Sequence, residues 1–128
     1  MKNLEYLWKK LEGTEEEKAY LENRFNEMSV KEQYILEGAK QIVEVKNASD
    51  IINLTEQLNN FDFHYKATDN ESLGEYVARH KECASDDILP FIKTEQLGSE
   101  YHEDFNGVFT DKGYVYQRNS LKQIYDGT

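Results

Sequence analysis

The side chains best suited to metal binding or nucleophilic catalysis are few in this chain, which has one cysteine and three histidines. His80 and Cys83 are three residues apart, and His102 directly precedes Glu103 and Asp104. A structural zinc site usually takes four ligands from recognisable pairs. A cysteine nucleophile needs an orienting third group and an oxyanion hole. The sequence therefore predicts no metal site, no cofactor and no catalytic residue.

Motifs that bind phosphates or calcium, or that present a catalytic serine, are also missing. The sequence contains no P-loop, no G-x-G-x-x-G, no G-x-S-x-G and no D-x-[DN]-x-[DN]-G loop. We therefore expect a protein that is not an enzyme. A small acid-based hydrolase is the enzymatic alternative.

Carboxylates dominate the chemistry of the chain, and they are concentrated in one part of it. The 128 residues include 25 Asp and Glu against 15 Lys and Arg, for a net charge of −10. Residues 47–111 contain 14 of these acids and only four Lys or Arg. This balance argues against nucleic acid as a direct partner, because phosphate binding depends on cations.

Such an acidic segment has two interpretations. One is a solvated surface that keeps the protein soluble. The other is a surface that imitates DNA, which carries one negative charge per roughly 1.7 Å of helix axis. The acids predicted to form the mimic surface are Asp50, Glu56, Asp62, Asp69, Glu71, Glu75, Glu82, Asp86, Asp87, Glu95, Glu100, Glu103 and Asp104.

The compartment can be predicted from cysteine usage and hydropathy. A lone cysteine fits a reducing environment. No apolar run approaches the roughly 20 residues of a membrane-spanning helix. The N-terminal residues Met1–Glu5 do not lead into the apolar core of a signal peptide. We expect a cytoplasmic protein that does not contact the membrane.

The first part of the chain has the spacing and capping residues of short helices. Apolar residues at intervals of three and four predict a helix over 4–11. Capping boxes that begin at Thr14 and Ser29 predict two further helix starts, and Asn47 or Ser49 caps a fourth helix. Connections this short predict an antiparallel bundle.

The pattern changes near residue 60. Residues 61–65 alternate large apolar and polar side chains, as in a strand, and two β-rich runs flank a turn at 111–113. Between them, one helical stripe begins at Leu73, and a short helix follows Ser85 and is expected to stop at Gly98. The predicted fold is α+β: an N-terminal antiparallel helical bundle followed by a small α+β domain with a three-stranded antiparallel sheet.

The predicted domain boundaries follow these pattern changes. Residues 1–59 form the helical domain, residues 60–118 form the C-terminal α+β domain, and residues 119–128 form a polar tail. No segment rich in Pro, Gly or Ser separates the two domains, so we expect them to pack together.

Four ordered blocks of the second half resemble the ArdA antirestriction proteins. They are Ser49–Leu58 with the aromatic strand Phe61–Tyr65, then Asp69–Tyr76, Phe91–Glu100 and Asn106–Val115. The third block is similar to the family's antirestriction motif, and the last resembles its terminal hairpin. The small α/β domain with which typical members begin has no counterpart, so we expect the chain to start at the helical domain.

The resemblance implies a function, a partner and an oligomeric state. ArdA proteins are acidic dimers that mimic B-DNA and inhibit type I restriction–modification enzymes by occupying their DNA-binding groove. Their dimer contact lies near the antirestriction motif, which corresponds here to Phe91, Ile92, Glu95, Leu97 and Gly98. The alternative is an interaction or regulatory module of a mobile element, with the same fold and no DNA mimicry.

Overall fold

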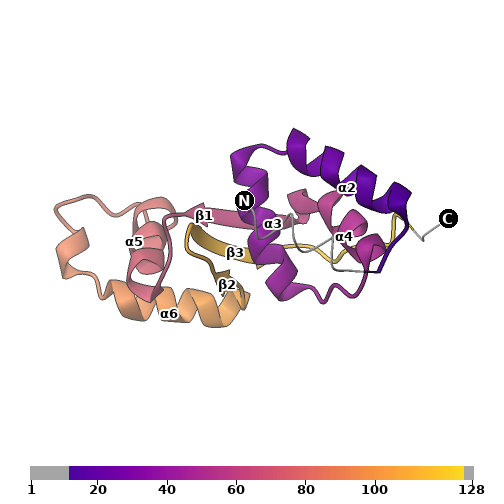
Figure 1. Cartoon of the computed structure of the whole chain (residues 1–128). Coiled ribbons are helices and arrows are strands. Elements are labelled where there is room, and N and C mark those ends of the chain that lie inside the picture. The colour runs from indigo at the N-terminus through magenta and orange to yellow at the C-terminus, as the bar shows by residue number, and fades with distance from the viewer. Residues whose placement is uncertain (1–11, 126–128) are drawn as a thin grey trace.

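The computed structural model describes residues 12–125 and confirms the predicted α+β class (Figure 1). Helices come first and a small three-stranded antiparallel sheet follows. The helix predicted over residues 4–11 lies outside the described residues. In chain order the elements are α2 (Glu15–Glu27), α3 (Val30–Ile42), α4 (Ala48–Thr55), the 3-10 turn η1 (Leu58–Asn60), β1 (Phe61–Tyr65), α5 (Asn70–His80), the 3-10 turn η2 (Leu89–Phe91), α6 (Thr94–Phe105), β2 (Val108–Phe109) and β3 (Gly113–Gln117).

The helix starts that the sequence predicts are confirmed in detail. The Thr14 hydroxyl accepts a hydrogen bond from the backbone N–H of Glu17 at 3.0 Å, and the Glu17 carboxylate accepts one from Thr14 N–H at 2.8 Å. Ser29 caps α3 in the same reciprocal way. Asn47, and not Ser49, caps α4. These side chains satisfy backbone donors that have no partner within the helix.

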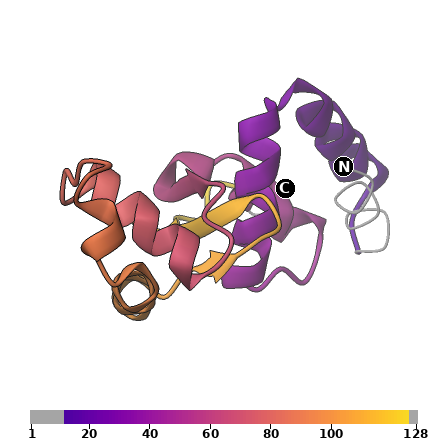
Figure 2. The ribbon, with the colours of Figure 1, turned by 90° about the vertical axis from the view of Figure 1, so that its left-hand side faces the viewer.

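The sheet separates two layers of helices because its two faces bury different side chains. β3 is the central strand, with β1 and β2 antiparallel on either side. Phe61 and Val115 join the core of α2, α3 and α4. Tyr114 and Tyr116 join a second core beneath α5 and α6. Figures 1 and 2 show the strands between the two helical groups. The predicted helical domain and the helices of the predicted α+β domain therefore pack on opposite faces of the same sheet.

Residues 119–125 return to the helical layer. Leu121 and Tyr125 pack against its core. The Asn53 side chain of α4 fixes this segment, because its carbonyl oxygen accepts from the N–H groups of Ile124 and Tyr125, both at 2.7 Å. The predicted tail is thus anchored to the helical layer through residue 125. None of the helices within residues 12–125 has the length and apolar character to cross a bilayer.

The packing of α5 on α6 corrects the sequence prediction for this region. The chain does not form one helix from Ser85 to a stop at Gly98. Ile92 is extended, with ψ 137°, and separates the short turn η2 from α6, which runs through Gly98. Gly98 lies directly against the backbone of α5. A Cβ atom at this position would lie 2.7 Å from the Gly74 nitrogen. Close approach of two backbones, and not helix termination, is the reason for glycine at this position.

Candidate functional site

The part of the molecule with the largest excess of carboxylates comprises α5, α6 and the segment that joins them, residues 69–105, which we call the acidic lobe. Its first acid is also a structural residue. The Asp69 carboxylate accepts a hydrogen bond from the backbone N–H of Ser72 at 2.8 Å, and the Ser72 hydroxyl accepts one from Asp69 N–H. The bond from the Ser72 backbone lowers the pKa of Asp69. This acid therefore stays ionised at neutral pH.

Ten of the thirteen acids predicted for the mimic surface lie on this lobe, and all ten are exposed. Within residues 69–105 only three Lys or Arg accompany them. Arg79 pairs with Asp86 at 2.5 Å, and this is the one ion pair that the ten acids form within residues 12–125. The ten are Asp69, Glu71, Glu75, Glu82, Asp86, Asp87, Glu95, Glu100, Glu103 and Asp104.

The other three predicted acids lie outside the lobe and are occupied by local partners. Asp50 accepts a hydrogen bond from the backbone N–H of Lys46 at 2.9 Å. Glu56 accepts from the Tyr20 hydroxyl and pairs with Arg24 at 3.7 Å. Asp62 of β1 is half-buried and faces the sheet's second core. These three carboxylates stabilise the fold around them and do not extend the surface of the lobe.

The residues predicted for a dimer interface are divided between the surface and the interior of the lobe. The Phe91 side chain is 87% exposed. Leu97 packs against the core of the lobe, and Gly98 is buried against α5. Ile88, three residues before Phe91, is 55% exposed, and the sequence analysis did not select it. The most exposed apolar side chains of the lobe are therefore Phe91 and Ile88 at its tip, while Phe105 of α6 is 43% exposed.

The two histidines considered for metal binding have structural partners instead. The His80 ring lies 4.4 Å from the Tyr76 ring, centroid to centroid. His102 Nδ1 makes a 2.8 Å hydrogen bond with the Tyr114 hydroxyl. Cys83 is exposed and has a positive φ of 55°. Among residues 12–125 no three His, Cys, Asp or Glu side chains gather as a metal site would require.

A buried polar network around His64 was missed by the sequence analysis. His64 Nε2 lies 3.0 Å from the Tyr101 hydroxyl, within hydrogen-bonding distance. Beside it, Asp62 accepts hydrogen bonds from the Tyr116 hydroxyl and from Arg118, both at 2.5 Å. The His64 and Tyr116 rings lie 5.7 Å apart, centroid to centroid. Two hydrogen-bonded pairs, His64 with Tyr101 and Asp62 with Tyr116, thus lie side by side in the core beneath α5 and α6.

The imidazole of His64 is held in its neutral form. Burial, reinforced by the positive charge of Lys81, lowers its pKa from 6.5 to about 4. Burial likewise raises the pKa of Tyr116, and the nearby Asp62 carboxylate adds to that rise. The network therefore has a fixed charge state from about pH 5 upward, with one carboxylate neutralised by Arg118.

This depressed pKa predicts an acid-sensitive fold. Between about pH 6.5 and pH 4 the unfolded chain binds a proton at His64 and the folded chain does not, so stability is full above pH 6.5 and declines as the pH falls. We expect a loss of roughly 3 kcal/mol over that interval, measured by urea denaturation at several pH values. His64→Gln should flatten the dependence, whereas His80→Gln should leave it in place. An unchanged slope in His64→Gln would contradict this assignment.

Comparison with known proteins identifies no relative of this chain. No protein-family model matches the chain, and no curated protein or solved structure matches it either.

Proposed function

We propose that this protein is an antirestriction protein that mimics B-DNA and occupies the DNA-binding groove of a type I restriction–modification enzyme in the cytoplasm. The observation that carries the proposal is the acidic lobe, where ten exposed carboxylates meet only three Lys or Arg. Such a surface can release its own associated cations when it binds a basic groove, much as DNA does. The resemblance of four sequence blocks to ArdA proteins supports the choice of enzyme.

The scaffold of the lobe suits this role because it holds the charges in place. The glycine contact between α5 and α6 brings the two helices together at the backbone. Tyr101 and Leu97 pack α6 on the sheet's second core. Acids on rigid helices lose little conformational freedom when a partner binds, so more of the electrostatic attraction remains as affinity.

The proposal is tested with a purified type I restriction–modification enzyme and an unmethylated plasmid that carries its recognition sites. The chain should protect the plasmid from cleavage in proportion to its concentration. It should also relieve restriction of incoming unmodified DNA in cells. Full cleavage at a large molar excess of the chain would remove the antirestriction function.

The exposed tip of the lobe favours a second candidate function, an interaction module without DNA mimicry. Phe91 and Ile88 present apolar surface at η2 that no described residue covers. Large exposed aromatic side chains are enriched at protein contacts. In this reading the acids serve solubility, and the tip binds a protein partner or a second copy of the chain.

Both candidates allow self-association, and the resemblance to ArdA predicts a homodimer. We expect light scattering to give twice the chain mass at tens of micromolar. Phe91→Ser should shift the protein to a monomer, since removal of a central aromatic anchor commonly costs about 2 kcal/mol or more of binding free energy. Ile124→Ser is the matched control, because Ile124 is also exposed but lies in the C-terminal segment. A monomeric wild-type protein would exclude the dimer, and a dimeric Phe91→Ser variant would place the contact elsewhere.

A further inference from the structure

β1 is an edge strand, and its ladder with β3 has a defined alternation. Just beyond the ends of β1, Lys66 N–H donates to the Lys112 carbonyl at 2.9 Å and Arg118 N–H donates to the Asn60 carbonyl at 2.7 Å. In an antiparallel pair, residues that exchange such bonds alternate with residues that do not. The even-numbered residues of β1 therefore hydrogen-bond to β3, and the odd-numbered residues direct their backbone groups to the opposite edge.

This opposite edge is unpaired among residues 12–125. The N–H of Phe61 is used by the turn η1, where it donates to the Leu58 carbonyl. The Phe63 N–H and both backbone groups of Tyr65 have no hydrogen-bond partner in the described chain. An unpaired edge is a template for another strand, so an extended segment can complete a second ladder here.

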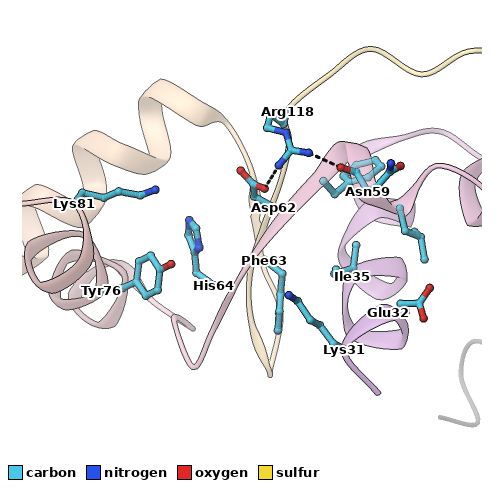
Figure 3. Close-up of a pocket in the computed structure, with 12 residues that line it drawn as sticks. Lys31, Glu32, Ile35, Asn59, Asp62, Phe63, His64, Tyr76, Lys81 and Arg118 are labelled. Atoms are coloured by element: carbon cyan, nitrogen blue, oxygen red, sulfur yellow. Dashed lines mark hydrogen bonds and ion pairs between the residues drawn. The ribbon is translucent and has the colours of Figure 1, made fainter. Parts of the chain in front are cut away.

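Two adjoining cavities provide space along this edge, and Figure 3 shows the first of them. Their volumes are about 540 and 550 Å³, and Lys31, Phe63 and Tyr76 line both. Phe63 packs toward the helical layer, whereas His64, which also lines the first cavity, faces the core beneath α5 and α6. A cavity lined by side chains from both faces of a strand lies at its edge. The open edge of β1 is thus the floor of a groove between α3 and α5.

Three rings in this groove, Tyr34, Phe63 and Tyr65, form what we call the aromatic cluster. Tyr34 of α3 stacks on Tyr65 with the ring centroids 6.4 Å apart, and its centroid lies 6.0 Å from that of Phe63. Tyr65 is 58% exposed, and Val30 beside the cluster is 60% exposed. Alternate side chains of a strand point to the same face. Every second side chain of an added strand would therefore contact these rings.

The rim of the groove is positively charged. Lys31 lines both cavities, and Lys81 lines the first. Lys66 and Lys112 hold their ammonium groups over two rings of the aromatic cluster, 5.6 and 6.0 Å from the centroids. None of these four lysines pairs with a carboxylate in the part of the chain that the structure describes. The groove is therefore basic in a protein whose net charge is −10.

The two carboxylates that line the cavities do not cancel this charge, because each is already neutralised. Glu32 pairs with Arg24 at 3.4 Å, and Asp62 pairs with Arg118 at 2.5 Å. Complementary charge steers partners and excludes wrong ones. The groove thus favours an acidic segment over a neutral or basic one.

A second copy of this chain fits the groove poorly. The β1 strand of each copy lies between its own α3 and α5, so pairing of two such edges would bring four helices together. It would also place lysines opposite lysines, a device by which edge strands avoid self-pairing. The groove suits an extended segment that has no helices beside it.

We propose that the open edge of β1 binds an extended, acidic segment of a partner protein as a fourth strand of the sheet. The backbone of the segment pairs with Phe63 and Tyr65, its alternate apolar side chains lie on the aromatic cluster, and its acids lie beside the lysines. In strand addition, main-chain hydrogen bonds supply affinity and side-chain pockets supply specificity. The site is separate from the exposed acids of the lobe and does not depend on the proposed DNA mimicry.

The proposal is tested by amide hydrogen exchange, followed by NMR on the full chain with the end-blocked peptide EETVTVTEE as the probe. In the free protein the Phe63 and Tyr65 amides should exchange faster than those of Asp62 and His64, which bond to β3. Saturating peptide should slow exchange of Phe63 and Tyr65 at least about tenfold and leave the other two nearly unchanged. No protection at millimolar peptide, or equal protection of all four amides, would overturn the proposal. Protection that instead rises with protein concentration alone would assign the edge to a second copy and also overturn it.

Two N-methylated forms of the probe test whether backbone pairing is responsible. One carries methyl groups on alternate amides of its TVTVT core, and the other carries them on the remaining amides of that core. Only one of these sets can face β1 in an added strand. One form should therefore lose binding and the other should keep it. Loss in both forms, or retention in both, would contradict strand addition.

A charge exchange tests the choice of an acidic partner. The peptide KKTVTVTKK has the same core and should bind the wild type at least about tenfold more weakly than the acidic probe. Lys31→Glu combined with Lys66→Glu should reverse this preference. Lys93→Glu combined with Lys122→Glu makes the same charge change outside the groove and should preserve it. All four positions are exposed, so both variants should fold. Equal affinity of the two peptides for the wild type, or the same preference in both variants, would contradict the site.

Discussion

Replacement of Gly98 by alanine should disrupt the packing of α5 on α6 and destabilise the whole protein. The added Cβ would lie 1.8 Å from the carbonyl oxygen of Asn70, a backbone atom that cannot rotate away. Ordinary overpacking costs about 1–3 kcal/mol, and a backbone collision belongs at or above the upper end of that range. We expect a loss of at least about 3 kcal/mol of unfolding free energy in urea denaturation.

A neighbouring residue of the same helix provides the control. Ser99 is exposed on α6, so Ser99→Ala should change stability by less than about 0.5 kcal/mol. Gly74→Ala should be as harmful as Gly98→Ala, because its Cβ would lie 1.6 Å from the Thr94 carbonyl oxygen. Stability close to that of the wild type in both glycine variants would show that the two helices do not cross at this contact.

Neutralisation of five acids on the lobe should abolish most of the inhibition of a type I restriction–modification enzyme. The five changes are Glu71→Gln, Glu75→Gln, Asp87→Asn, Glu103→Gln and Asp104→Asn. They leave the capping residue Asp69 and the ion pair of Asp86 intact. A single exposed charge contributes only about 0–1 kcal/mol, so single variants should lose little. Together the five should raise the inhibiting concentration on the order of a hundredfold.

The matched control changes the net charge by the same amount on the helical layer. Glu15, Glu16, Glu22, Glu27 and Glu44 are exposed there, and their replacement by glutamine also removes five negative charges. If inhibition depends on a local surface, this control should keep nearly wild-type potency in the plasmid-cleavage assay. Equal losses in both fivefold variants would show that total charge, and not the acidic lobe, is responsible. Equal potency in both would remove these acids from the inhibitory surface.

Local signals in the sequence were sufficient for much of the fold. Capping boxes at Thr14 and Ser29 require only residues three apart, and both helices begin where predicted. The alternation of residues 61–65 predicts a strand, and a strand is present. The final hairpin is also confirmed, although β2 is only two residues long. The helix caps and the hairpin have their stabilising partners nearby in the chain, whereas the strand 61–65 is recognised from its own alternation and pairs with the distant β3.

The extent of α6 could not be predicted because it depends on a tertiary contact with α5. A glycine after an apolar stripe ordinarily indicates a helix end. Gly98 instead lies inside α6, where the contact with Gly74 requires a residue without a side chain. Nothing within a window of ten residues distinguishes these two uses of glycine, since the second glycine belongs to the preceding helix.

The candidate sites also combine features that the sequence predicts with features that depend on tertiary contacts. The sequence indicates which segment is acidic, but not that Asp62 pairs with Arg118, which is 56 residues away. Strand alternation places His64 on the same face of β1 as Asp62, and this was an available signal. Tyr101, which contacts His64, comes from α6, so this contact becomes visible only in the folded chain.

The most direct test of the proposed DNA mimicry is competition between this chain and a DNA duplex for a purified type I restriction–modification enzyme. The experiment measures the inhibition constant of the chain at salt concentrations from about 50 to about 200 mM. A mimic that uses the same basic groove should displace the duplex, and its inhibition constant should weaken at least about tenfold over that range. Failure to displace the duplex at any ratio, or displacement with no salt dependence, would contradict the account.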